Sequence, residues 1–324
     1  MTARSTRRPS TAKPRTRTSR LAVAGAVAVA GSLLLTACGD QTDDTKKEGG
    51  GEATKAAAPL FDQLPKAIQD KGVVRVGSDI AYPPVEFKDG SGKTVGIDPD
   101  IAAALGKQLG VTFDFQNGTF DTLITGLRSK RYDMAMSAMT DTKDRQNGVD
   151  SETGKKVGEG VDFVDYLTAG VSIYTKKGDT QGIKTWADLC GKKIAVQRGT
   201  VSEDLAKDQS AKCGAKKIAI EAFDNDLEAQ TRLRAGGADA GSADFPVAAY
   251  AAKTAGGGKE FEVVGEQVEA APYGIAVAKD NAQLRDALKA ALDAIIKNGE
   301  YQKILDKWGV AAGAVTAATV NGGS

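Results

Sequence analysis

The sequence predicts an α/β fold with mostly parallel sheets, and two observations carry the prediction. Apolar runs of strand length alternate with segments of helical periodicity over most of the chain. Residues that start and stop helices stand between them: Asp98-Pro99 has the pattern of an N-cap followed by proline, and Gly110 is placed to end that helix. The length of 324 residues leaves room for about two domains.

The elements follow in order. Apolar runs with β-branched residues predict strands at 73–77, 111–115, 133–138, 171–174, 193–196, 218–222, 238–241 and 274–278. Helical spacing predicts helices at 100–109, 120–128, 202–209, 227–235, 246–255, 281–297 and 301–308. The polar segment 146–161 carries four glycines and five charged residues, and we expect a surface hairpin there. Residues 312–324 are small and predict a flexible tail.

The chain contains no histidine. This excludes catalysis by Ser-His-Asp or Cys-His systems, zinc or haem ligation by histidine, and a histidine pH switch. No metal site and no cofactor are predicted, and any catalysis would depend on carboxylates, Lys, Tyr or Cys.

The first 37 residues have the pattern of a lipoprotein signal peptide. Seven basic residues and no acidic one precede a fifteen-residue apolar run over 21–35, which is shorter than a membrane span. The sequence LTAC at 35–38 then predicts cleavage and lipid attachment at Cys38. A signal-anchored helix with an incidental cysteine and a twin-arginine signal at 6–8 are the alternatives. The expected location is the outer face of a bacterial cytoplasmic membrane.

Removing residues 1–37 changes the charge balance. The whole chain has 43 Lys+Arg against 42 Asp+Glu, whereas residues 38–324 have 36 against 42, a net charge of −6. A mildly acidic chain without a basic stripe is not expected to bind nucleic acid. Residues 38–59 are polar and glycine-rich and predict a disordered tether.

Two cysteines remain besides Cys38. Cys190 and Cys213 would lie in an oxidising compartment, where pairing is the usual state, and we expect a disulfide. Two buried free thiols are the alternative.

Six stretches give the chain a specific resemblance. They read VGSDIAYPPVEF at 76–87, VGIDPDIA at 95–102, SAMTDTKDR at 137–145, DLCGKKIAVQRGT at 188–200, AGGADA at 235–240 followed by Asp244, and GEYQKILDKWG at 299–309. In these stretches the chain resembles the family 3 extracellular solute-binding proteins, the amino-acid receptors of ABC importers. The resemblance implies a two-lobed periplasmic-binding-protein type II fold with two hinge strands. Lobe 1 would comprise 60–168 and 268–311, and lobe 2 would comprise 169–267.

The resemblance also implies a ligand site in the cleft between the lobes. The implied positions are Asp79, Tyr82, Phe120, Ala138, Thr140, Arg145, Thr200 and Asp244. An arginine fork suits a carboxylate, and an aspartate at the carboxyl end of a strand suits an ammonium group. For each residue type a purely structural role is the alternative: a solvated ion pair for Arg145, helix caps for Thr200 and Asp244, and core packing for the two aromatic residues. The presence of Asp79 does not by itself show whether the ligand is a basic or a neutral amino acid.

The predicted function is capture of a polar or charged amino acid by hinge closure and its delivery to an ABC permease. The chain lacks a Walker motif, so it is not the ATPase. We expect a monomer and no enzymatic activity. A ligand-sensing receptor for a signalling partner is one alternative. A carboxylate-driven lyase of the cyclohexadienyl dehydratase type, with Glu86 as its acid, is the other.

Overall fold

The structure is a computed structural model that describes residues 58–324. The predicted signal peptide (1–37), the lipidation site Cys38 and the predicted tether as far as residue 57 lie outside the described residues. Within 58–324, no helix combines the length and the apolar character needed to cross a membrane. No cluster of three or more potential metal ligands occurs in the same part of the chain.

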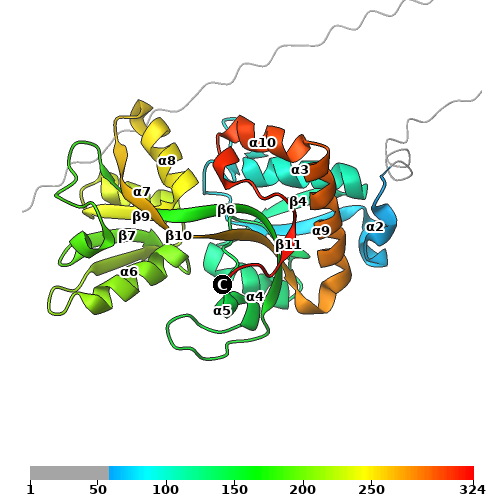
Figure 1. The fold of residues 1–324 in the computed structure, drawn as a ribbon, viewed down its shortest axis with the longest axis horizontal. Coiled ribbons are helices and arrows are strands. Elements are labelled where there is room, and N and C mark those ends of the chain that lie inside the picture. Colours follow the sequence, from blue (N-terminus) through cyan, green and yellow to red (C-terminus); the bar gives the residue numbers. More distant parts are fainter. Residues whose placement is uncertain (1–57) are drawn as a thin grey trace, which may run out of the picture. The chain divides into compact units, whose positions relative to one another are not determined.

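The described residues form an α/β fold around a nine-stranded sheet (Figure 1). Its order is β4 (Thr112–Asn117), β1 (Val73–Ser78), β5 (Met134–Ala135), β10 (Phe261–Ala278), β6 (Val161–Lys176), β9 (Ala240–Asp244), β7 (Lys193–Gln197) and β8 (Ala219–Phe223), with β11 (Thr319–Val320) added to β6. The pairings β1–β4, β1–β5, β7–β8 and β7–β9 are parallel. A separate hairpin joins β2 (Phe87–Lys88) to β3 (Thr94–Val95). The predicted fold class is confirmed.

Helices pack around the sheet in two groups, which we call lobe 1 and lobe 2. Lobe 1 holds β4, β1 and β5 with α2 (Lys66–Lys71), α3 (Ile97–Leu109), η2 (Phe120–Thr122), α4 (Leu123–Arg128), α5 (Lys143–Asn147), α9 (Ala282–Lys297) and α10 (Glu300–Trp308). Lobe 2 holds β9, β7 and β8 with η3 (Trp186–Leu189), α6 (Val201–Lys212), α7 (Asp226–Arg234) and α8 (Phe245–Thr254). The long antiparallel strands β6 and β10 run from one group to the other (Figure 1).

The β6–β10 pair is irregular where the chain passes between the lobes. Its register shifts between Val264 and Val268, again between Val268 and Ala271, and once more between Tyr273 and Gly274. Breaks in a ladder remove hydrogen bonds and bend the strands locally. The two strands that connect the lobes are therefore least regular near the crossing point.

The first helix after the 76–87 motif begins differently from the prediction. Gly96, and not Asp98, is the N-cap of α3, and Gly110 ends the helix in a left-handed conformation at φ 67°. Asp98 is fully buried, and its carboxylate accepts hydrogen bonds from the Ala138 N–H and the Tyr166 hydroxyl. The N-cap prediction for Asp98 is wrong because these tertiary partners replace the local one.

Cys190 and Cys213 form the predicted disulfide. It joins the residue after η3 to the residue after α6, so both ends lie in lobe 2. The two residues are 23 positions apart, and closing a loop of that length in the unfolded chain stabilises the fold by about 3.5 kcal/mol.

The segment after α5 forms the predicted hairpin. Val149 and Lys156 make an isolated antiparallel bridge, and the Asp150 N–H donates to the Lys155 carbonyl at 2.9 Å. The hairpin also reaches lobe 2: the Ser151 hydroxyl donates to Asp204 of α6 at 3.0 Å, and Lys207 pairs with Glu152 at 3.1 Å. It therefore links the two lobes beside the cleft.

The segment 312–324 does not behave as the flexible tail that its composition predicts. Thr319 and Val320 pair with Asp165 and Val164 of β6 as strand β11. The following residues, as far as Gly323, donate and accept further hydrogen bonds with lobe 1. The prediction is wrong here because backbone and amide hydrogen bonds, and not large apolar side chains, fix the segment.

Candidate functional site

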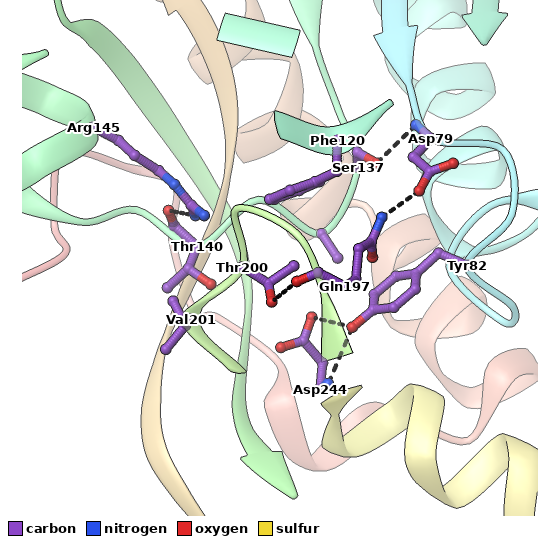
Figure 2. Close-up of a pocket in the computed structure, with 11 residues that line it drawn as sticks. Asp79, Tyr82, Phe120, Ser137, Thr140, Arg145, Gln197, Thr200, Val201 and Asp244 are labelled. Atoms are coloured by element: carbon purple, nitrogen blue, oxygen red, sulfur yellow. Dashed lines mark hydrogen bonds between the residues drawn. The ribbon is translucent and has the colours of Figure 1, made fainter. Parts of the chain in front are cut away.

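All eight residues predicted to bind the ligand line one pocket between the lobes (Figure 2). About 300 Å³ of space at the pocket is not filled by protein atoms, and part of that space is open to solvent. Its lining comprises Asp79, Tyr82, Phe120, Ser137, Ala138, Thr140 and Arg145 from lobe 1, with Gln197, Thr200, Val201 and Asp244 from lobe 2. The topology brings these residues together, since most of them follow the carboxyl ends of strands β1, β5, β7 and β9.

Arg145 supplies the cation of the pocket. It lies on the short helix α5, where Thr142 is the N-cap and accepts a hydrogen bond from the Arg145 N–H at 3.3 Å. One guanidinium nitrogen donates to the Thr140 carbonyl at 2.7 Å, and another donates to the Gly199 carbonyl of lobe 2 at 2.9 Å. The guanidinium carbon lies 5.3 Å from the centre of the Phe120 ring. The planar fork thus faces the cleft and already contacts both lobes.

Asp79 provides a buried carboxylate at the end of β1. It is 4% exposed, and in Figure 2 it lies on the side of the pocket away from Arg145. Its carboxylate accepts a hydrogen bond from the side-chain amide of Gln197, which closes β7 in lobe 2. Burial raises the pKa of Asp79 to about 6, and the charges of Glu228 and Asp121 act in the same direction. A cation from a ligand would stabilise the ionised form of this group.

Asp244 provides the second carboxylate, at the end of β9. Its Oδ2 accepts a hydrogen bond from the Tyr82 hydroxyl at 3.0 Å, and its own N–H donates to the same hydroxyl oxygen at 3.1 Å. Burial raises the pKa of Asp244 to about 6. Asp244 is the N-cap residue of α8, but its side chain makes no capping hydrogen bond there. The carboxylate is therefore directed to the cleft and not to its own helix.

Ala138 is held in an unusual backbone conformation. Its φ is 45°, in the left-handed region that residues with a Cβ seldom adopt. The Ala138 N–H donates to the buried Asp98 at 3.2 Å. Next to it, the Ser137 hydroxyl donates to Glu86 at 2.6 Å and accepts from the Asp79 N–H at 3.0 Å. Asp98 and Glu86 thus lie behind the pocket wall and fix its backbone.

Thr200 serves as a helix cap and as a lining residue together. Its hydroxyl accepts from the Glu203 N–H at 3.3 Å as the N-cap of α6, and donates to the Gln197 carbonyl at 2.7 Å. Val201, the first residue of α6, also lines the pocket. The positive end of the α6 dipole therefore faces the cleft near Arg145.

Sequence reasoning missed three lining residues: Ser137, Gln197 and Val201. Each is next to, or within three positions of, a residue that it found. Gln197 ends an apolar strand just before Gly199-Thr200, so its place at a strand's carboxyl end was a usable signal. Its contact with Asp79 spans 118 positions in sequence, and no local pattern carries that information.

Comparisons with known proteins agree with this geometry. Residues 74–311 match the model of the bacterial extracellular solute-binding proteins, family 3. The arginine-binding protein ArgT of Corynebacterium glutamicum is 32% identical over 298 residues, which cover 90% of this chain and 93% of ArgT.

Two solved structures are similar as well. An ancestral arginine-binding protein bound to arginine has a TM-score of 0.66 and 38% identity, covering 73% of this chain and 98% of that chain. An ancestral amino acid-binding protein, described as a precursor of cyclohexadienyl dehydratase, has a TM-score of 0.65 and 37% identity, covering 75% of this chain and 97% of that chain. With its two lobes, its linking strands and its charged interlobe pocket, the chain belongs to the bacterial extracellular solute-binding proteins, family 3.

Proposed function

We propose that this protein captures a basic amino acid, arginine foremost, as the substrate-binding component of an ABC importer. The observation that carries the proposal is the charge pattern of one pocket, where Arg145 is opposed by two carboxylates, the buried Asp79 and the half-buried Asp244. A zwitterion needs one cation and one anion from the protein. The second carboxylate matches the additional positive charge of a basic side chain. The arginine-binding relative and the arginine-bound ancestral structure support this choice.

The pocket suggests one orientation for such a ligand. The α-carboxylate would bind Arg145, with the hydroxyls of Thr140 and Thr200 and the start of α6 beside it. The α-ammonium would bind Asp244 and the Ala138 carbonyl. The ligand's guanidinium group would face Asp79, and its methylene chain would lie against the rings of Tyr82 and Phe120.

Hinge closure is the mechanism that we infer. Lobe 1 and lobe 2 each contribute part of the lining, and β6 and β10 are irregular where they cross between them. A ligand that contacts both lobes binds the closed form more tightly and shifts the population towards it. Moving from 1% to 99% closed requires about 5.5 kcal/mol of differential binding free energy, which charge-assisted hydrogen bonds at both ends of the ligand can supply.

We infer a binding role and not a lyase reaction. Glu86, the acid that the lyase alternative requires, is fully buried behind Ser137 and is not among the lining residues. One chain supplies all the residues around the pocket, so a monomer suffices for capture. The closed form would then be recognised by the importer's permease.

We also infer that the protein is anchored outside the cytoplasmic membrane through a lipid on Cys38. Support comes from the LTAC sequence at 35–38 after a basic and then apolar leader. Cys38→Ser should release the protein from membranes into the soluble fraction of cells that make it. Unchanged membrane association of that variant would contradict the lipid anchor.

Isothermal titration with arginine, lysine, glutamine and glutamate tests the binding function. Arginine should bind most tightly. Arg145→Ala should weaken arginine binding by about 100-fold or more, because the α-carboxylate loses its charged partner inside a desolvated site. Arg131→Ala is the matched control, since Arg131 is exposed and does not line the pocket. Unchanged affinity in the Arg145 variant, or no binding of any basic amino acid by the wild type, would contradict the proposal.

A further inference from the structure

The most informative feature outside the pocket is the segment 318–323, which we call the strap. It lies beyond residues 74–311, the part that matches the family model. Its first anchor is the Ala318 N–H, which donates to Asp293 of α9 at 2.8 Å. β11 then pairs with β6, and the Thr319 hydroxyl and the Gly322 N–H both donate to the Asp165 carboxylate, at 2.8 and 3.0 Å.

Asn321 secures the middle of the strap. Its N–H donates to the Phe163 carbonyl at 3.1 Å, and its side-chain carbonyl accepts from the Phe163 N–H at 2.8 Å. Its side-chain amide donates to Asp162 at 3.0 Å. These contacts direct the next residues towards the loop that carries Thr140.

The strap ends on a buried carboxylate beside the ligand site. The Gly323 N–H donates to Oδ2 of Asp141 at 2.8 Å, and the other oxygen, Oδ1, accepts from the side-chain amide of Gln146 at 2.7 Å. Asp141 is fully buried, and Gln146 is 7% exposed. One carboxylate therefore joins the strap to the helix α5.

Two residues of the ligand site are direct neighbours of this connection. Thr140 precedes Asp141, and Arg145 precedes Gln146. The Thr140 carbonyl also accepts a hydrogen bond from Arg145 at 2.7 Å. The loop is also held by β10, where the Asp141 N–H donates to the Pro272 carbonyl at 2.8 Å. The loop thus has two supports, one from β10 and one from the strap.

The approach of the strap to the loop requires glycine. A Cβ added at position 323 would lie 1.9 Å from the Asp141 carbonyl oxygen, which is backbone and cannot rotate away. A Cβ at position 322 would lie 2.8 Å from the Asp165 carboxylate and 2.9 Å from the Thr319 hydroxyl, but would not meet Asp141. Substitutions at the two neighbouring glycines therefore test two different contacts. A side chain at position 323 would disturb the contact with the loop that carries Thr140, and one at position 322 would disturb the contact with Asp165 of β6.

We propose that the strap is a positioning element for the ligand site: Gly323, acting through Asp141, fixes Thr140 and Arg145 in the arrangement that holds the ligand's α-carboxylate. The proposal rests on the proposed function for the identity of the ligand. Asp141 and Gly323 are positioning residues, since neither lines the pocket.

The test compares Gly323→Ala with Gly322→Ala by arginine titration, thermal unfolding without ligand, and hydrogen exchange of the amides in 140–147. Gly323→Ala should raise the Kd for arginine at least tenfold and accelerate exchange in 140–147, while Tm changes by no more than about 3 °C. Gly322→Ala should lower Tm with little change in Kd or in exchange of that loop. Gly90→Ala, at an exposed position with no atom within 4 Å of the added Cβ, should match the wild type in every measurement.

The proposal would be overturned if Gly323→Ala left both the Kd and the exchange of 140–147 unchanged. It would also be overturned if Gly323→Ala and Gly322→Ala changed the Kd and the exchange to the same extent. If the wild type binds no basic amino acid, the proposed function fails, and the exchange measurement alone decides on the strap. If Gly323→Ala does not fold, Asp141→Asn replaces it. The Asp141 carboxylate accepts one hydrogen bond from Gly323 and one from Gln146, each on a different oxygen. An asparagine has only one side-chain oxygen, so one of these bonds is lost, and the same rise in Kd and in exchange rate is expected.

Discussion

Single side chains in the pocket differ in what they can contribute to ligand choice. In the proposed orientation, Arg145 and Asp244 would face the groups that all α-amino acids share, whereas Asp79, which lies apart from Arg145, would face the ligand's side chain. Asp79 is also the more deeply buried of the two carboxylates. A charge in such a site interacts strongly with an opposite charge brought to it.

Asp79→Asn should therefore weaken arginine binding by about 30-fold and change glutamine binding by less than about threefold, as measured by titration at pH 7.5. The reason is that a neutral amide keeps the size of the carboxylate but removes its attraction for a guanidinium group. Asp114→Asn, at an exposed position on β4, is the control and should leave both affinities unchanged. Equal losses for both ligands would show that Asp79 maintains the pocket and does not select the ligand.

The lining of the pocket was largely predictable at this scale. All eight predicted residues line the pocket, because strand ends and helix starts are marked locally in the sequence and the family resemblance supplied their grouping. The left-handed conformation of Ala138 was not predictable, since it depends on Asp98, 40 positions earlier. The partners of Asp98 and Glu86 are likewise set by packing, which no spacing along the chain encodes.

Among the elements, the hairpin after α5 adds a further connection between the lobes, outside the pocket. Its two contacts with α6, Ser151 with Asp204 and Glu152 with Lys207, lie at the surface. Exposed pairs of this kind contribute at most about 1 kcal/mol each and weaken as salt rises. Because the pairs join lobe 1 to lobe 2, whatever they contribute favours the closed form.

The double variant Ser151→Ala, Glu152→Gln should raise the Kd for arginine by about two- to fivefold at low ionic strength. The rise should come from a faster dissociation rate, because the lost pairs stabilise the closed form. At about 0.3 M salt the difference from the wild type should largely disappear. Lys156→Gln, an exposed residue of the same hairpin, is the control. A decrease in Kd, or an effect that grows with salt, would contradict a closing role for the hairpin.

The hairpin and the strap show what element-level prediction can and cannot find. The polar, glycine-rich composition of 146–161 predicts a turn correctly, because turn residues act locally. The small residues of the strap predict flexibility incorrectly. Order there comes from the carboxylates of Asp141 and Asp165, more than 150 positions away in the chain.

At the scale of the whole molecule, burial or partial burial raises the pKa of several carboxyl groups towards neutral pH. Burial raises the pKa of Asp98 and Asp226 to about 7, and that of Asp79, Asp165 and Asp244 to about 6. An unfolded aspartate titrates near 3.9. The folded protein therefore binds more protons than the unfolded chain between about pH 4 and 7. The stability that these groups contribute is present at low pH and is lost as pH rises through the folded pKa values.

The ligand-free protein should therefore show a higher Tm at pH 5.5 than at pH 8, by several degrees. The Kd for arginine should change in the opposite sense and rise by about tenfold between pH 7.5 and pH 5, since the cation binds the ionised forms of Asp79 and Asp244 and protons compete with it. Thermal scans and titrations across this range measure both. A Tm that falls steadily from pH 8 to pH 5.5, or an affinity independent of pH, would contradict the assignment of these carboxyl groups.

Part of the overall architecture was predictable, because the burial of a strand shows in its amino-acid sequence. Strands inside a parallel sheet are buried and largely apolar, so β1 and β7 stand out in the sequence, whereas the edge strands β4 and β8 are partly exposed. The extents of β6 and β10 were underestimated, because each continues from one lobe into the other through half-exposed and polar residues. Hydrogen bonding with a partner strand, which the sequence does not reveal, sets their length.

If the ligand is a basic amino acid, as proposed, the contact between Gln197 and Asp79 would let the pocket discriminate against neutral amino acids. Asp79 already has an amide donor from its own chain. A glutamine ligand would exchange one amide for another, with little difference in free energy. A guanidinium group replaces an uncharged donor with a charged, two-pronged one, so only the basic ligand gains from displacing Gln197. In that case the Gln197 side chain would compete with the ligand for Asp79, and only a ligand group that binds Asp79 more strongly than this amide would displace it.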